Sequence, residues 1–188
     1  MLFIRSKRTK QKMINTRKIV LLGDTNVGKT RFFESMLVRS LMEQTNEWEH
    51  GSTSSPQPRA WSDVAIPTLG VDVFPYRCVH KGNNVLLNVW DCGGKHKGLG
   101  NTYWKKAQYA IVMFDVENYN IASLRKYVHE IKRVCYEIPI LLVINKDDDG
   151  SFVFNGTFEG CFAMVAISCK EKRNLDAPFN LIMERMLY

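Results

Sequence analysis

Hydrophobic and polar positions follow two different periods along the chain, and each change of period predicts a new element. Compact aliphatic runs predict buried β-strands over residues 18–22, 109–115, 140–145 and 161–168. Apolar residues at three- and four-residue spacing predict amphipathic helices over residues 29–42, 121–136 and 177–187. Strands that alternate with helices are typical of a mostly parallel sheet with helices on both faces, so we expect an α/β fold.

A hairpin pattern separates the first predicted helix from the next aliphatic run. Two extended segments, residues 70–79 and 85–91, are joined by the turn sequence KGNN, in which Gly82 and Asn83 tolerate positive φ. We expect these segments to pair antiparallel and to bring the sheet to six strands. Residues 43–66 have no periodicity and are rich in Ser, Thr, Pro and Gly. A stretch this long inside a compact domain is either functional or disordered.

Charge is distributed unevenly along the 188 residues, whose formal net charge is +7. Met1 to Lys18 contains seven basic and no acidic residues, which leaves 19 basic against 19 acidic residues in the rest of the chain. We therefore expect a flexible basic arm over residues 1–16 and a single domain over residues 17–188. The arm is interpreted as a solvated tail, a nuclear import signal, a tether to acidic lipid or nucleic acid, or an organelle transit peptide.

The cysteines and histidines show no pattern of a disulfide framework or a zinc site. The five cysteines include no C-x-x-C pair, and the four histidines are scattered among them without zinc-ligand spacing. Free thiols indicate a reducing compartment, so cytoplasm or nucleus is expected. The longest apolar runs are far shorter than the roughly 20 residues of a membrane-spanning helix.

The sequence GDTNVGKT matches the phosphate-loop pattern G-x-x-x-x-G-K-[ST] and lies between a predicted strand and a predicted helix. Gly28 allows the backbone N–H groups to face an anion, Lys29 is expected to reach the β- and γ-phosphates, and the Thr30 hydroxyl is expected to bind Mg²⁺. The alternative is a tight glycine turn with a surface lysine. The residues expected to contact the phosphates are Gly23, Asp24, Thr25, Asn26, Val27, Gly28, Lys29, Thr30 and Arg31.

Asp91 ends the predicted strand VLLNVWD, at the edge of the sheet where ligands bind in such folds. Its carboxylate is the expected water-mediated partner of Mg²⁺ beside Thr30. Gly94, three residues later, can donate its backbone N–H to a γ-phosphate.

The segment Asn145 to Asp148 follows another strand and reads N-K-x-D. The carboxylate of Asp148 can accept two hydrogen bonds from guanine, whereas adenine offers no such pair of donors. The stem of Lys146 can lie along the base. Ser168, Cys169 and Lys170 follow the last strand, where a backbone N–H can reach the guanine O6. A plain acidic surface turn is the alternative interpretation.

In this order the motifs resemble those of the Ras-superfamily small GTPases, and TLGVDVFP, NVWDCGG, AQYAIVMFDV, RVCYEIPILLVINK and DAPF are most similar to the Ran family. The resemblance implies a three-layer P-loop G domain that binds GTP, GDP and Mg²⁺. It identifies Thr68 as the switch I threonine on Mg²⁺ and γ-phosphate, and residues 92–104 as switch II. It also implies a monomer that binds an exchange factor, an activating protein, effectors and transport receptors.

The chain also departs from that family. Thirty-seven residues separate Thr30 from Thr68, so switch I carries an insertion at about residues 43–66. Asn26 replaces a glycine, and Asn tolerates left-handed φ. The stretch SFVFNGTFEG stands where a helix is usual, so that face is expected to be remodelled. With Tyr188 as its last residue the sequence has neither the acidic tail of Ran nor a prenylation motif.

Lys95 stands where the family places the glutamine that orients water for hydrolysis. A protonated lysine cannot accept a hydrogen bond from water, although it can neutralise charge on the γ-phosphate. Lys29, Thr68 and Lys95 are therefore the expected catalytic residues of a GTP/GDP switch with slow hydrolysis, and His96 is an alternative base. A nucleotide-bound interaction module locked in one state and a P-loop kinase or ATPase are the competing interpretations.

Overall fold

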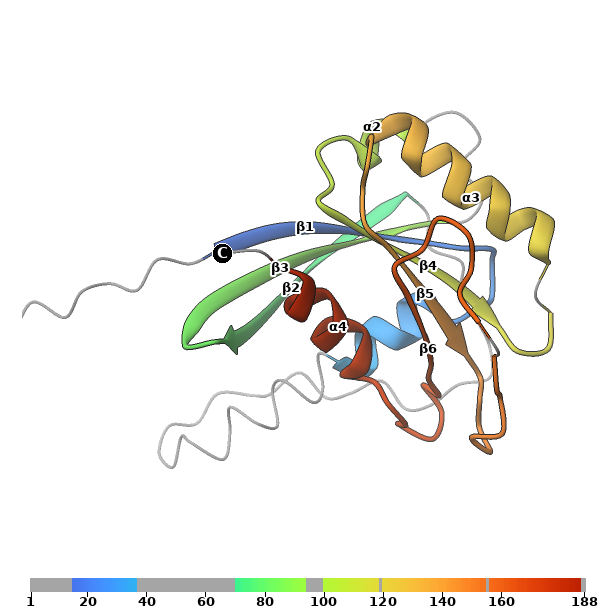
Figure 1. Ribbon diagram of the computed structural model, residues 1–188. Helices are drawn as coiled ribbons and strands as arrows, with labels where there is room; N and C mark the ends of the chain where they lie inside the picture. The colour runs from blue at the N-terminus through green and yellow to red at the C-terminus, as the bar shows by residue number, and fades with distance from the viewer. Residues whose placement is uncertain (1–14, 37–69, 94–99, 119, 155, 187–188) are drawn as a thin grey trace, which may run out of the picture.

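A computed structural model describes residues 15–36, 70–93, 100–118, 120–154 and 156–186 (Figure 1). Its centre is a six-stranded sheet in the order β2-β3-β1-β4-β5-β6. β2 and β3 pair antiparallel, and all the other neighbours pair parallel. The predicted fold class is therefore confirmed. The strands are β1 (Asn15–Leu22), β2 (Val71–His80), β3 (Asn83–Cys92), β4 (Tyr109–Asp115), β5 (Ile140–Asn145) and β6 (Ala163–Ala166).

Helices cover both faces of the sheet, and each covers its own hydrophobic core. Residues 29–36 are helical, and α4 (Ala177–Arg185) lies on the same face of the sheet as they do (Figure 1). α2 (Gly100–Trp104) and α3 (Ile121–Val134) cover the opposite face. Alternate residues of β1 serve the two cores, because successive side chains of a strand point to opposite faces. Ile19 and Leu21 belong to the first core, and Val20 and Leu22 to the second.

Aromatic stacking holds the first helical segment against its neighbours. Phe32 stacks on Phe179 of α4 with ring centroids 5.6 Å apart, and Phe33 stacks on Phe74 of β2 at 4.0 Å. Both Phe32 and Phe33 are fully buried. The helix that follows the phosphate loop is thus fixed to both β2 and α4, which holds the loop in place.

Several element boundaries differ from the sequence-based predictions. β1 begins at Asn15, so two residues assigned to the basic arm pair with β3. β6 is shorter than the predicted strand over residues 161–168, and α2 was not predicted. The hairpin turn uses Lys81 and Gly82 at φ 46° and 75°, not Gly82 and Asn83. Positive φ at both central residues is the geometry that matches strand twist in a two-residue hairpin.

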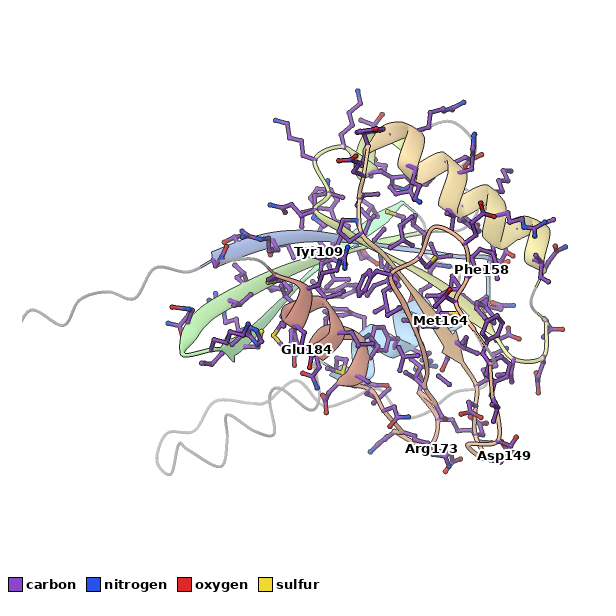
Figure 2. The ribbon with its side chains drawn as sticks, viewed as in Figure 1. Tyr109, Asp149, Phe158, Met164, Arg173 and Glu184 are labelled. Carbon is purple, nitrogen blue, oxygen red and sulfur yellow. The ribbon has the colours of Figure 1, made fainter. Side chains whose placement is uncertain are left out.

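The connection from β5 to β6 contains no helix among the residues that the structure describes there, 146–154 and 156–162. It contributes aromatic side chains instead: Phe152 and Phe158 pack against the core that lies under α3. Figure 2 labels Phe158. Gly160 lies close to α3, since a Cβ at this position would meet Lys132 Nζ at 2.7 Å. The remodelling expected for this face is therefore present.

Some expectations fall outside the described residues. These are the basic arm up to residue 14, the switch I insertion at about residues 43–66, and the part of the first helix after residue 36. Among the helices that the structure describes, none is long and apolar enough to cross a membrane.

Candidate functional site

The phosphate loop follows β1 and depends on two glycines with positive φ. Gly23 has a φ of 144°, and a Cβ there would clash with the backbone carbonyl of Met113 in β4. Gly28 has a φ of 95°, and a Cβ there would clash with the side-chain nitrogen of Asn145. Asn26 adopts a φ of 66°, as expected for an Asn that replaces glycine. The loop therefore approaches β4 and β5 more closely than any side chain would allow.

Lys29 lies folded over this loop. Its side chain is buried, and Nζ donates hydrogen bonds to the carbonyls of Gly23 at 3.0 Å and Asp24 at 2.7 Å. Burial lowers the pKa of Lys29, and the nearby Asp91 and Asp24 carboxylates oppose that shift. The structure thus holds a cation at the inner rim of the loop, where it can neutralise phosphate oxygens.

Thr30 and Asp91 meet at the start of the helix. The Thr30 hydroxyl donates to Asp91 Oδ2 at 2.6 Å, and the Asp91 side chain is fully buried at the end of β3. A hydroxyl and a carboxylate are hard oxygen ligands that suit Mg²⁺. The described residues contain no group of three or more His, Cys, Asp or Glu side chains able to hold a metal alone. Phosphate oxygens and water would have to complete the coordination.

Asn145 joins the phosphate loop to the opposite side of the site. Its Nδ2 donates to the carbonyl of Val27 at 2.9 Å, and its Oδ1 accepts from the backbone N–H of Cys169 at 3.1 Å. The side chain is buried at the end of β5. One amide therefore connects three segments that are far apart in the sequence.

Asp148 is oriented by the segment after β6. Its Oδ1 accepts from the Ser168 hydroxyl at 2.6 Å, and its Oδ2 lies 3.6 Å from Lys170 Nζ. Lys146 has a φ of 65°, and its Nζ forms an ion pair with Asp115 Oδ2 at 3.0 Å. This arrangement fixes both side chains of the N-K-x-D motif and leaves the Asp148 carboxylate partly accessible.

A comparison with known protein families identifies the family of the chain. Residues 18–148, more than half of the chain, match the family described as Ras of Complex, Roc, domain of DAPkinase. The chain belongs to the Roc family. A Roc domain is a GTP-binding, P-loop domain of the Ras superfamily, and GTP hydrolysis is the general activity of that group. The match covers the phosphate loop, Asp91 and the N-K-x-D motif, and it ends before Ser168.

The structure of the Roc domain brings most of the predicted site residues to one edge of the sheet. The positions outside the described residues are Thr68, Gly94, Lys95 and His96. Arg31 forms an ion pair with Glu34 at 3.1 Å, and the side chain of Lys170 is largely exposed but lies 3.6 Å from the Asp148 carboxylate of the site. The residues brought together are Gly23, Asp24, Thr25, Asn26, Val27, Gly28, Lys29, Thr30, Asp91, Asn145, Lys146, Asp148, Ser168 and Cys169.

Sequence reasoning missed two contributors to the Roc site. Asp115 ends β4 opposite Asn145 and holds Lys146, and its place at a strand end beside the motif was a usable signal. Tyr127 of α3 donates its hydroxyl to Asp24 Oδ1 of the phosphate loop at 3.2 Å. Burial raises the pKa of Tyr127, and Asp24 raises it further. No motif in the sequence marked Tyr127, because the contact depends on how α3 packs.

Proposed function

We propose that this Roc domain is a GTP/GDP switch that binds guanine nucleotide with Mg²⁺ and hydrolyses GTP slowly. The observation that carries the proposal is the pair of hydrogen bonds made by Asn145. They hold the phosphate loop and the Asp148–Ser168 pair at one fixed spacing, so that a single nucleotide can bridge phosphates and base. Identifying the nucleotide that co-purifies with the full chain is the first test, and an adenine nucleotide there would contradict the proposal.

Base selection is assigned to Asp148. A carboxylate held by the Ser168 hydroxyl can accept from both N1–H and the exocyclic amine of guanine. Asp148→Asn replaces one acceptor with a donor, so we expect the affinity for GDP to fall and the affinity for xanthosine diphosphate to rise. A P-loop kinase or ATPase would instead prefer ATP. Competition between GTP and ATP for the protein therefore distinguishes a GTPase from a kinase or ATPase.

Metal binding is assigned to Thr30 and, through water, to Asp91, with Thr68 joining them when GTP is bound. Bound Mg²⁺ would neutralise charge on the β- and γ-phosphates. Thr30→Asn should weaken GTP binding more than GDP binding in the presence of Mg²⁺. Thr30→Ser keeps the hydroxyl and is the matched control. Equal affinities for GTP in the wild type and Thr30→Asn would contradict this assignment.

Slow hydrolysis is proposed from Lys95, with Lys29 and Thr68 as the other catalytic residues. Water that attacks the γ-phosphate needs an acceptor, and a protonated lysine offers none. Single-turnover hydrolysis of bound GTP should be faster in Lys95→Gln than in the wild type. Lys97→Gln removes the same charge two residues away and should change nothing, while His96→Ala tests the histidine as an alternative base. An unchanged rate in Lys95→Gln would contradict the role of Lys95.

A second candidate function is supported by the same lysine. If Lys95 holds the γ-phosphate without promoting hydrolysis, the domain is an interaction module locked in its GTP state. GTP recovered intact after prolonged incubation with the wild type would favour the locked module, and steady conversion to GDP would favour the switch.

We further propose a Ran-like switch within the Ras superfamily, on the basis of the five sequence stretches quoted above. On this proposal a monomer in the cytoplasm or nucleus binds an exchange factor, an activating protein, effectors and transport receptors. Its basic arm contacts acidic lipid or nucleic acid. Binding of a purified nuclear-transport receptor that requires GTP and fails with GDP would support the Ran-like assignment, and equal binding in both states would contradict it.

A further inference from the structure

The segment to which base selection is assigned above, Asp147 and Asp148, lies at the start of the irregular connection from β5 to β6. Asp147 and Asp148 follow β5, and the described residues between them and β6 form only turns, bends and backbone without regular structure. Backbone carbonyls at such a position need partners to hold the segment in one conformation. The partner for two of these carbonyls is a side chain from a distant part of the chain.

Arg173 supplies that partner. Its guanidinium donates from NH1 to the carbonyl of Asp147 and from NH2 to the carbonyl of Asp148, both at 2.9 Å. Figure 2 shows Arg173 and Asp149 at the same end of the molecule. The planar guanidinium presents two parallel N–H groups, a geometry that a lysine ammonium cannot reproduce.

The backbone of Arg173 pairs with that of Ser168, the residue whose hydroxyl contacts Asp148. Its N–H donates to the carbonyl of Ser168 at 3.0 Å, and the N–H of Ser168 donates to the carbonyl of Arg173 at 3.1 Å. Ser168 in turn donates its hydroxyl to the Asp148 carboxylate. Asp148 is therefore held from two directions, at its carbonyl by the Arg173 side chain and at its carboxylate by the residue that pairs with the Arg173 backbone.

Gly150 leaves the space that the guanidinium occupies. A Cβ at Gly150 would lie 2.5 Å from Arg173 NH1. Gly156, in the same connection, has a φ of 117° and no neighbouring atom within 4 Å of the corresponding position. The two glycines thus allow the effect of displacing Arg173 to be separated from the effect of backbone strain.

We infer that Arg173 is a positioning residue for guanine specificity, which clamps the backbone of Asp147 and Asp148 so that the Asp148 carboxylate faces the base. Arg173 lies beyond residues 18–148, the part of the chain that matches the Roc family. The inference rests on the proposed guanine-nucleotide binding. It predicts that loss of the clamp weakens recognition of the guanine 2-amino group more than it weakens the hold on the phosphates.

The test compares GDP with inosine diphosphate, which lacks the 2-amino group, in competition for the full-length protein. Since inosine diphosphate keeps N1–H, the ratio of the two affinities isolates the hydrogen bond from the 2-amino group to the Asp148 carboxylate. Loss of one aligned hydrogen bond to a charged group lowers such a ratio about tenfold, and this drop is expected for both Arg173→Gln and Arg173→Lys. The control is Arg17→Gln, because Arg17 lies toward the amino end of β1 and donates to the carbonyl of Thr16.

Other outcomes would overturn the inference. If the Arg173 variants bind GDP and inosine diphosphate more weakly by the same factor, Arg173 serves stability alone. If Arg173→Lys keeps the wild-type ratio of affinities, the charge of Arg173 matters and its planar geometry does not. A wild type that does not distinguish the two nucleotides would overturn the proposed function and this inference together. If the wild type prefers GDP and both Arg173 variants keep the same ratio of affinities, the proposed function stands and the clamp is rejected.

A second pair of variants covers the case in which the Arg173 variants do not fold. Gly150→Ala should lower the ratio by displacing the guanidinium, and Gly156→Ala should not, although its φ is less favourable for alanine. The clamp is rejected if both glycine variants give the wild-type ratio, or if both lower it equally. Thermal unfolding of each variant confirms that the native fold is compared.

Discussion

The two sides of the site are built on different physical principles. On the phosphate side, Gly23 and Gly28 let the loop approach β4 and β5, and buried Lys29 caps the carbonyls of the same loop. On the base side, polar side chains orient one another: Ser168 holds Asp148, and Asp115 holds Lys146. The first side depends on glycines that let the backbone approach its neighbours closely, and the second depends on hydrogen bonds and ion pairs between side chains.

This difference separates steric from polar control of the site. A clash against a backbone carbonyl or a buried amide cannot be relieved by rotating a surface side chain, so the phosphate side should tolerate almost no change. A hydrogen bond at a partly exposed position can be replaced by water, so changes on the base side should be graded. Asn145 contacts both sides, so a change at Asn145 should affect the phosphate side and the base side together.

The largest effect is expected for Gly28→Ala. The added Cβ would clash with Asn145, whose amide is already fixed by two hydrogen bonds, and the φ of 95° is unfavourable for alanine. We expect a loss of about 3 kcal/mol in the free energy of unfolding, in the range of severe core and backbone changes. Urea denaturation measures it, and GDP binding should fall below detection. The control is Gly156→Ala, and equal destabilisation of the two variants would contradict the steric explanation.

Asn145→Ala should have the next largest effect, because it removes the link between the two sides. The Val27 carbonyl and the Cys169 N–H each lose a partner in a buried region. The expected cost is about 2 kcal/mol in the free energy of unfolding, since unsatisfied buried polar groups are expensive. Affinity for GDP and for isolated pyrophosphate should both fall, as measured by calorimetric titration. A loss confined to one of these ligands would show that Asn145 serves one side alone.

Tyr127→Phe should have a smaller effect on the phosphate side. It removes the hydrogen bond from α3 to Asp24 and leaves the partly buried aromatic ring packed against the core. We expect a loss of about 0.5 kcal/mol in stability, as for a partly exposed neutral donor. GDP should dissociate a few-fold faster, by the usual conversion of such an energy to a rate. Displacement of a fluorescent GDP by excess GDP measures the rate, and Tyr136→Phe, at an exposed tyrosine, is the control.

The smallest effect is a loss of stability above neutral pH from a buried thiol on the base side. Burial raises the pKa of Cys169 from 9.0 to about 12. The thiol therefore ionises in the unfolded chain before it ionises in the folded one, and the stability that is fully present near neutral pH is lost as the pH rises through 9 toward 12. Between pH 8 and pH 9 the free energy of unfolding falls by about 0.3 kcal/mol from this thiol. Urea denaturation at both pH values should give a shallower decline in Cys169→Ala, and an identical decline would contradict the prediction.

Much of the site was predictable because its parts are local in sequence. The phosphate-loop pattern, Asp91 at a strand end and N-K-x-D each combine a short motif with a predicted strand, and the strand register brings them to one edge. The predicted helices also fell close to α3 and α4, because their apolar spacing is regular. The hairpin turn and the ends of β6 were placed wrongly by one or two residues, since turn type depends on strand twist and pairing as well as on the turn sequence.

The amino-acid sequence by itself determined the strands, the conformational freedom of Gly23 and Gly28, and the phosphate-loop and N-K-x-D motifs. These follow from preferences that act within a few residues. Only the tertiary structure decided that Asn145 reaches Val27 across 118 residues, that Tyr127 reaches Asp24 across 103, and that Arg173 donates to the carbonyls of Asp147 and Asp148. Contacts between distant segments depend on strand order, register and packing angle, which no local pattern encodes.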